Sequence, residues 1–94
     1  METVGYFVVD ELGVHGIGAT ETAAWADCRR VLDLVGVDVL DDDADTTDQD
    51  GGWTKLSKFR CYPATAAAMA AVEKLGGNRG WVVQDGVAYA DGEV

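Results

Sequence analysis

A run of aspartates between residues 38 and 50 is the feature that most limits how this chain folds. The run reads Asp38-Val-Leu-Asp41-Asp42-Asp43-Ala-Asp45-Thr-Thr-Asp48-Gln-Asp50. Like charges in water repel one another and keep such a segment extended and solvated, and carboxylates almost never lie in an apolar interior unless they are paired. We therefore expect an acidic loop at about residues 38–52, inserted in one domain that spans residues 1–94.

The charge of the chain is concentrated in its first half. Its 94 residues are enough for one core, and 48% hydrophobic with 26% charged residues is ordinary for a globular domain. The 17 acidic against 7 basic side chains give a net charge of −10, which argues against direct binding of nucleic acid, because phosphate contacts need a basic face. Residues 1–50 hold 13 acidic side chains and two arginines, a net of −11, whereas residues 51–94 hold four acidic and five basic ones, a net of +1.

The sequence shows no sign of export or of a membrane anchor. The segment Met1–Gly5 is acidic and lacks the basic start and long apolar core of a signal peptide. No apolar run approaches the roughly 18–20 residues that a bilayer span needs. We expect a cytoplasmic protein with no membrane partner, in which Cys28 and Cys61 are reduced thiols.

The first half of the chain predicts a strand pair followed by a helix. Residues 3–9 are β-branched and aromatic and apolar on both faces, which is typical of an interior strand, and residues 14–17 return as its antiparallel partner. Thr20 is a typical N-cap for the helix that follows. Apolar residues then recur at steps of three, four and three and predict its buried stripe. These residues are Trp25, Cys28, Leu32 and Val35. A brief strand over residues 37–40 precedes the aspartates.

The second half predicts one strand, a helix and a hairpin. Residues 53–62 read as a strand, and the alanine-rich residues 65–75 as a helix with Pro63 at its first position. The buried side of that helix is expected at Met69, Val72 and Leu75. The pair Asp85-Gly86 between two apolar runs indicates a tight hairpin. The predicted fold is α+β, with two helices packed on one face of an antiparallel sheet, in the order β-β-α-(β)-β-α-β-β.

The acidic run does not match a calcium site of the EF-hand kind. Asp41, Asp43 and Asp45 fit the first, third and fifth positions of such a loop. Thr46 stands where the loop needs glycine, and Gly52 where it needs a bidentate glutamate. The sequence therefore predicts no specific metal site, although clustered carboxylates bind divalent cations loosely.

No catalytic or cofactor-binding residues are predicted. His15 is the only histidine, and both cysteines fall on predicted apolar faces. A small enzyme that uses His15 with Cys28 or Cys61 is an alternative, which requires an exposed pair at a cleft. The glycines between Gly13 and Gly18 do not complete a phosphate-binding loop, since Glu21 stands at the position of its last glycine.

A dense array of carboxylates on a small scaffold attracts surfaces lined with lysine and arginine. In a cell, the grooves of nucleic-acid-binding proteins are abundant surfaces of this kind, and we expect a basic protein partner. Trp53 follows the acidic run directly, where a tryptophan could anchor such a partner. The predicted partner-binding residues are Asp38, Asp41, Asp42, Asp43, Asp45, Asp48, Asp50 and Trp53.

In size, acidity and α+β plan the chain resembles the anti-CRISPR proteins of phages and plasmids, several of which mimic nucleic acid. The stretches Gly5–Gly13 and Gly18–Cys28 also resemble small uncharacterised proteins of bacterial mobile elements. The resemblance implies a non-enzymatic inhibitor that binds a basic nucleic-acid-binding surface of a CRISPR effector subunit, as a monomer or small homo-oligomer. An alternative is an antitoxin or immunity protein that neutralises a basic toxin by the same electrostatics.

Overall fold

The computed structural model describes residues 2–47 and 50–93, which form seven strands, two α-helices and a short 3-10 helix. In chain order the elements are β1 (Thr3–Asp10), β2 (Gly13–Gly18), α1 (Glu21–Leu34), β3 (Asp38–Leu40), β4 (Trp53–Lys55), η1 (Leu56–Lys58), β5 (Arg60–Thr65), α2 (Ala66–Leu75), β6 (Trp81–Gln84) and β7 (Val87–Ala90). The predicted α+β class is confirmed, and the element order is close to the predicted one. The strand expected over residues 53–62 is divided by η1 into β4 and β5.

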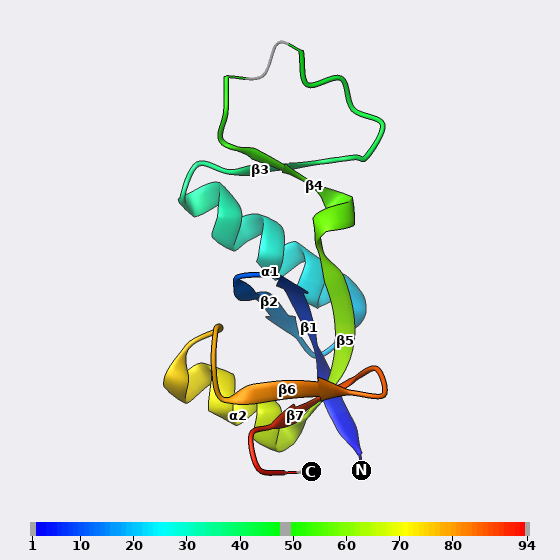
Figure 1. The fold of residues 1–94 in the computed structure, drawn as a ribbon, viewed down its shortest axis with the longest axis vertical. Coiled ribbons are helices and arrows are strands. Elements are labelled where there is room, and N and C mark those ends of the chain that lie inside the picture. Colours follow the sequence, from blue (N-terminus) through cyan, green and yellow to red (C-terminus); the bar gives the residue numbers. More distant parts are fainter. Residues whose placement is uncertain (1, 48–49, 94) are drawn as a thin grey trace.

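The strands form one large sheet and one small one. The large sheet has five strands in the order β2-β1-β5-β7-β6, and all neighbours are antiparallel except β5 and β7. The small sheet is a parallel pair of β3 and β4. The molecule measures 45 × 22 × 20 Å, with the segment between β3 and β4 at one end of the long axis and the β6–β7 hairpin near the other (Figure 1).

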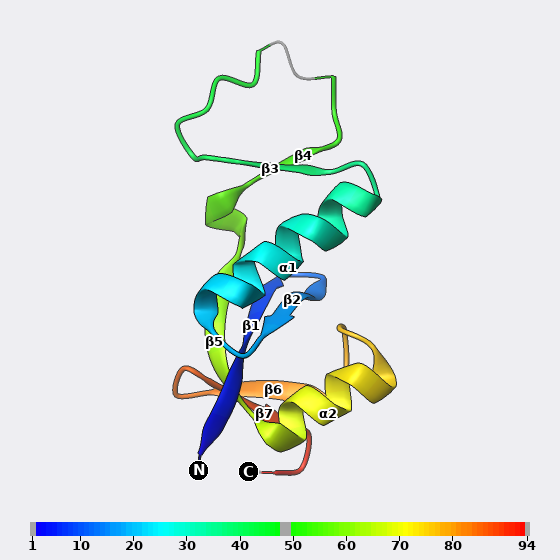
Figure 2. The ribbon, with the colours of Figure 1, turned by 180° about the vertical axis from the view of Figure 1, so that it is seen from behind.

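The two helices pack against opposite faces of β1. Tyr6 and Val8 lie in a cluster with α1, whereas Phe7 and Val9 lie in a second cluster with α2. Because successive strand residues point to opposite faces, β1 is covered on both sides. The expectation that both helices cover one face is therefore wrong at the central strand. Figure 2 shows α1 running across β1 and β2, and α2 beside the β6–β7 hairpin.

Helix α1 keeps most of its predicted buried stripe. Thr20 is the N-cap, and its side chain accepts a hydrogen bond from the N–H of Ala23 at 3.1 Å. Cys28 and Leu32 are buried as expected. Val35 is 70% exposed instead, because α1 ends at Leu34 and Val35 is its C-cap.

Helix α2 begins one residue later than predicted. Thr65 is its N-cap, and Pro63 lies inside β5 opposite Tyr6 rather than in the helix. Val72 is buried, whereas Leu75, the last residue of the helix, is 43% exposed. Across the described residues, no helix has both the length and the apolar character needed to cross a bilayer.

The predicted hairpin is confirmed. Asp85 and Gly86 both adopt positive φ, at 53° and 78°, as a two-residue turn of the type I′ kind demands. The turn sets Gln84 opposite Val87 and joins β6 to β7 in regular register. This hairpin forms the far edge of the large sheet.

Candidate interaction surface at the acidic end

The acidic loop is held at its base by two parallel strands. Asp38 pairs with Trp53 and Leu40 with Lys55, and the Asp38 N–H donates to the Gly52 carbonyl at 2.7 Å. Two parallel strands run in the same direction, so the chain must travel back from the end of the first strand to the level of its start before the second strand begins. The loop that connects β3 to β4 must therefore be long. The described parts of this connection, residues 41–47 and 50–52, extend beyond α1 (Figure 1).

Gly52 allows the loop to close. Its φ is +65°, and a Cβ at this position would lie 2.6 Å from the carbonyl oxygen of Gly36. A side chain here would therefore suffer both an unfavourable backbone conformation and a clash. The glycine pair that ends the acidic run has a structural role in bringing β4 back beside β3.

The Lys55 side chain holds the backbone of the loop through hydrogen bonds. Its Nζ donates to the backbone carbonyls of Asp41, Asp42 and Ala44, at 3.4, 3.1 and 2.8 Å. The Ala44 N–H also donates to the Asp41 carbonyl at 3.0 Å, which makes residues 41–44 a turn. The sequence predicts an extended segment, and the structure shows instead a turn wrapped around an ammonium group.

The described aspartate side chains of the loop are exposed. The Oδ1 of Asp42 accepts from the N–H of Ser57 at 2.8 Å, and the Oδ1 of Asp45 accepts from both the hydroxyl and the N–H of Thr47. The side-chain hydrogen bond from Thr47, followed by its backbone one, lowers the pKa of Asp45 below its usual value. The exposed members described are Asp38, Asp41, Asp42, Asp43, Asp45 and Asp50. Asp48, also predicted for this surface, lies outside the described residues.

These carboxylates have no cationic side chain paired with them among the described residues. Among the described residues, the ion pair between Arg30 and Asp27 and the contact between His15 and Asp10 both lie elsewhere. Helix α1 ends beside the loop, and its last turn carries no basic residue to offset the negative end of the helix dipole. Asp33 lies in that turn and is exposed. The negative charge at this end is therefore left for solvent or a partner to neutralise.

Trp53 stands at the edge of the acidic surface. It pairs with Asp38 across the small sheet and is only partly buried. Unlike Trp25 and Trp81, it belongs to neither core cluster. Trp53 is thus partly exposed beside the aspartates and outside both core clusters.

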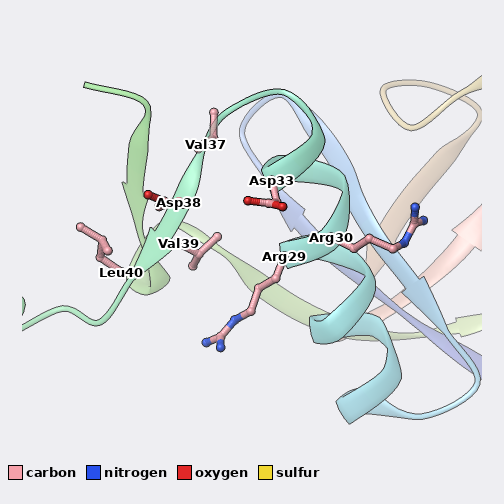
Figure 3. Close-up of a pocket in the computed structure, with 7 residues that line it drawn as sticks. All are labelled: Arg29, Arg30, Asp33, Val37, Asp38, Val39 and Leu40. Carbon is pink, nitrogen blue, oxygen red and sulfur yellow. The ribbon is translucent and has the colours of Figure 1, made fainter. Parts of the chain in front are cut away.

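A groove lies between α1 and β3, next to the loop. Its volume is about 540 Å³, and its lining residues are Arg29, Arg30, Asp33, Val37, Asp38, Val39 and Leu40 (Figure 3). In Figure 3 the Arg30 side chain extends away from β3, in keeping with its 2.6 Å bond to Asp27, whereas the Asp33 carboxylate is directed toward the strand. The lining thus combines three apolar residues with two arginines and two aspartates, and the two carboxylates are the groups that a partner's arginine or lysine would contact.

Sequence reasoning missed this groove. Val37 and the residues of β3 line one side and the last turns of α1 line the other, and these segments come together only in the folded chain. Next to the groove, the apolar residues Leu34 and Val35 are 74% and 70% exposed at the end of α1, although the sequence placed Val35 on the buried stripe. Exposed apolar residues beside a charged loop are typical of binding surfaces.

Cys28 is not the exposed nucleophile that a Cys/His enzyme requires, and Cys61 is partly buried. Cys28 is fully buried in the α1 cluster, and burial, with Asp10 and Asp27 nearby, raises the pKa of its thiol to about 11. Burial also raises the pKa of Cys61. His15 instead lies with its Nε2 2.7 Å from Asp10 Oδ1 and its ring edge-on to Phe59. This arrangement ties the β1–β2 turn together.

The loop aspartates do not converge on a common point. Within residues 2–47 and 50–93, no three His, Cys, Asp or Glu side chains come together as the ligands of a metal ion. The dispersed carboxylates suit an extended cationic surface better than a single ion. Comparison of the chain with protein-family models, with curated proteins and with solved structures finds no match.

Proposed function

We propose that this chain is a non-enzymatic inhibitor that binds the basic, nucleic-acid-binding surface of another protein through its acidic end. One observation carries the proposal: the exposed aspartates gather at one end of an elongated molecule, and the described lysine nearest to them uses its ammonium group on backbone carbonyls. The resemblance to anti-CRISPR proteins makes a CRISPR effector subunit the proposed partner.

The ordered base of the loop supports this role. Lys55 and the β3–β4 pair fix residues 38–45 before any partner arrives. A surface that is already ordered loses less conformational entropy on binding than a flexible acidic tail would. The carboxylates then act at long range, because a field of one sign raises the rate of encounter with a surface of the other sign.

The groove and Trp53 provide the short-range contacts that electrostatics lacks. An arginine or lysine of the partner would lay its stem on Val37 and Val39 and direct its charge to Asp33. Trp53 would add apolar contact at the rim. Long-range attraction and a nearby apolar anchor together would give a specific complex rather than general adhesion to cations.

The first test removes the charge of the loop without removing its hydrogen bonds. In a variant carrying Asn at positions 41, 42, 43 and 45, the amide oxygens still accept from Ser57 and Thr47. With a purified, guide-loaded CRISPR effector, we expect association to slow on the order of tenfold at low salt. The dependence of the rate on salt, measured by stopped-flow fluorescence, should also flatten.

The control removes the same number of charges from the rest of the surface. Its substitutions are Glu2→Gln, Glu73→Gln, Asp85→Asn and Asp91→Asn, all at exposed positions. Association rates equal to wild type are expected for this control. A loop variant that binds as fast as wild type at every salt concentration would sink the electrostatic mechanism. Capture of a basic toxin, and not of the effector, from cells carrying both systems would assign the antitoxin role instead.

A further inference from the structure

The two edges of the large sheet differ in whether their backbone groups are bonded. At the β2 edge, the Val14 N–H donates to the Gly77 carbonyl at 2.6 Å. The Ile17 N–H donates to the Asp27 carboxylate of α1 at 3.0 Å. The sheet order makes β2 and β6 the two edge strands, and β2 is closed to a further strand by these bonds.

The β6 edge is open. Within residues 2–47 and 50–93, no backbone N–H or C=O of β6 is bonded to anything outside its hairpin. In a two-residue hairpin the residues that flank the turn, here Gln84 and Val87, exchange both hydrogen bonds. Hydrogen-bonded and non-hydrogen-bonded pairs alternate along an antiparallel pair of strands, so the N–H and C=O of Val83 point away from β7. The N–H and C=O of Ala88, the residue paired with Val83, correspondingly point toward β5, with which Ala88 forms the parallel bridge.

The side chains of β6 do not protect its open edge from pairing with another strand. Natural edge strands are protected by lysine, proline or a bulge. Trp81–Gln84 contains no charged residue and no proline, and its register with β7 is unbroken. Val82 and Val83 are each 39% exposed. An uncharged, regular strand with exposed valines is therefore available on an otherwise closed sheet.

We propose that β6 pairs antiparallel with β6 of a second copy of this chain, about a two-fold axis at Val83. In that register Val83 lies opposite its symmetry mate, and the two residues exchange N–H and C=O bonds as a hydrogen-bonded pair. In the same register Val82 lies opposite Gln84 of the second copy, and Trp81 lies opposite Asp85 of its turn, so that the central residues facing each other are uncharged.

The charge distribution favours a second copy on this edge. Residues 76–94, which include the hairpin, hold Arg79 against Asp85, Asp91 and Glu93, a net charge of −2, whereas residues 38–50 alone hold seven aspartates. β6 also lies far along the long axis from the acidic loop (Figure 1). Two copies joined at β6 therefore keep their acidic ends apart. The inference does not depend on the partner proposed for the acidic loop.

Sedimentation equilibrium of the wild-type chain over a wide range of concentration gives the first test. We expect a monomer–dimer equilibrium for wild type and a monomer at every concentration for Val83→Lys. Leu12→Lys, which adds the same charge at a 72% exposed apolar position elsewhere, should dimerise like wild type. A wild-type chain that stays monomeric throughout would overturn the proposal and leave the edge to a strand of a different protein.

A cross-linking experiment guards against misfolding of the lysine variant. The Cα atoms of a hydrogen-bonded antiparallel pair lie about 5.5 Å apart, within the range that a disulfide spans. Under mild oxidation Val83→Cys should form a covalent dimer much faster than Leu12→Cys, and the native thiols are common to both variants. Equal rates of cross-linking for the two variants would contradict the Val83 register.

Discussion

Lys55 shows how one side chain determines the shape of a loop whose composition favours disorder. The segment it supports is rich in aspartate, and repulsion among these carboxylates would drive the chain apart. The ammonium group does not pair with a carboxylate; it binds three carbonyl oxygens of residues 41–44. The loop therefore keeps its full negative charge on the outside while its backbone is held from the inside.

Replacing Lys55 by methionine keeps the stem and removes the donor. We expect the free energy of unfolding to fall by about 1 kcal/mol, a value usual for the loss of partly exposed hydrogen bonds. Amide hydrogen exchange in residues 41–47 should accelerate at the same time. Lys58→Met, at an exposed neighbouring position, is the matched control and should change neither quantity. Unaltered exchange in the Lys55 variant would show that the strands alone hold the loop.

Because of Cys28, we expect part of the free energy of unfolding to be lost at alkaline pH. Its thiol pKa rises from 9.0 to about 11 in the folded state, so folding favours the protonated form. The associated stability is complete below about pH 9 and is lost as the pH rises toward about 11. Urea unfolding across this range should show a steeper fall for wild type than for Cys28→Ala. Parallel curves for the two proteins would mean that the thiol titrates alike in the folded and unfolded states.

At the level of elements, glycines on β2 decide how closely α1 approaches the sheet. A Cβ added at Gly16 would meet the Ala24 carbonyl oxygen and would lie 2.7 Å from the Cβ of Cys28. Helix and strand backbones are thus in direct contact here, and the buried position of Cys28 depends on that contact. No rearrangement of a flexible side chain can relieve the clash, because the obstructing atoms belong to the helix core.

Gly16→Ala should therefore destabilise the fold more than an alanine at the hairpin turn. Gly86 has a φ of +78° and open space around an added Cβ, so Gly86→Ala should lower the free energy of unfolding by only about 1–2 kcal/mol through its backbone conformation. Overpacking at Gly16 is expected to lower it by about 3 kcal/mol. Urea unfolding of both variants makes the comparison. Equal effects would show that α1 moves freely on β2.

The elements that could be predicted from the sequence are those with a local signal. Thr20 and the spacing of Cys28 and Leu32 located α1, and the Asp85-Gly86 pair located the β6–β7 hairpin. Pro63 misled the prediction of α2, because proline is also accepted in a strand where its missing N–H is not needed. The prediction did not place the two helices on opposite faces of the sheet. The apolar character of residues 3–9 on both faces was a sign that this strand is covered on both sides.

The candidate site was predictable in its charge and unpredictable in its geometry. The positions of the aspartates follow from the sequence, but the β3–β4 pairing and the Lys55 contacts join residues more than ten positions apart. Short parallel strands carry little sequence signal, since three residues are too few to show a period. The groove beside α1 joins segments that come together only in the folded chain, so it could not be found from the sequence.

At the scale of the whole molecule, charge and shape divide the chain into two ends with different physical properties. The acidic loop, the end of α1 and the groove lie together at one end of a body 45 Å long. The nearly neutral β6–β7 hairpin lies toward the other (Figure 1). Contacts with a cationic partner and contacts between identical copies would thus use separate surfaces, and variants at one end should leave the other unaffected.

The bonds that Val14 and Ile17 donate along β2 have a consequence for how far assembly can proceed. A sheet with two available edges adds subunits without limit and grows into a filament. Of the two edges of the large sheet in the described residues, the β6 edge alone is open, so the pairing proposed at β6 leaves no open edge of that sheet for a third chain. Growth stops at a pair, and concentrated solutions of this acidic protein should remain clear.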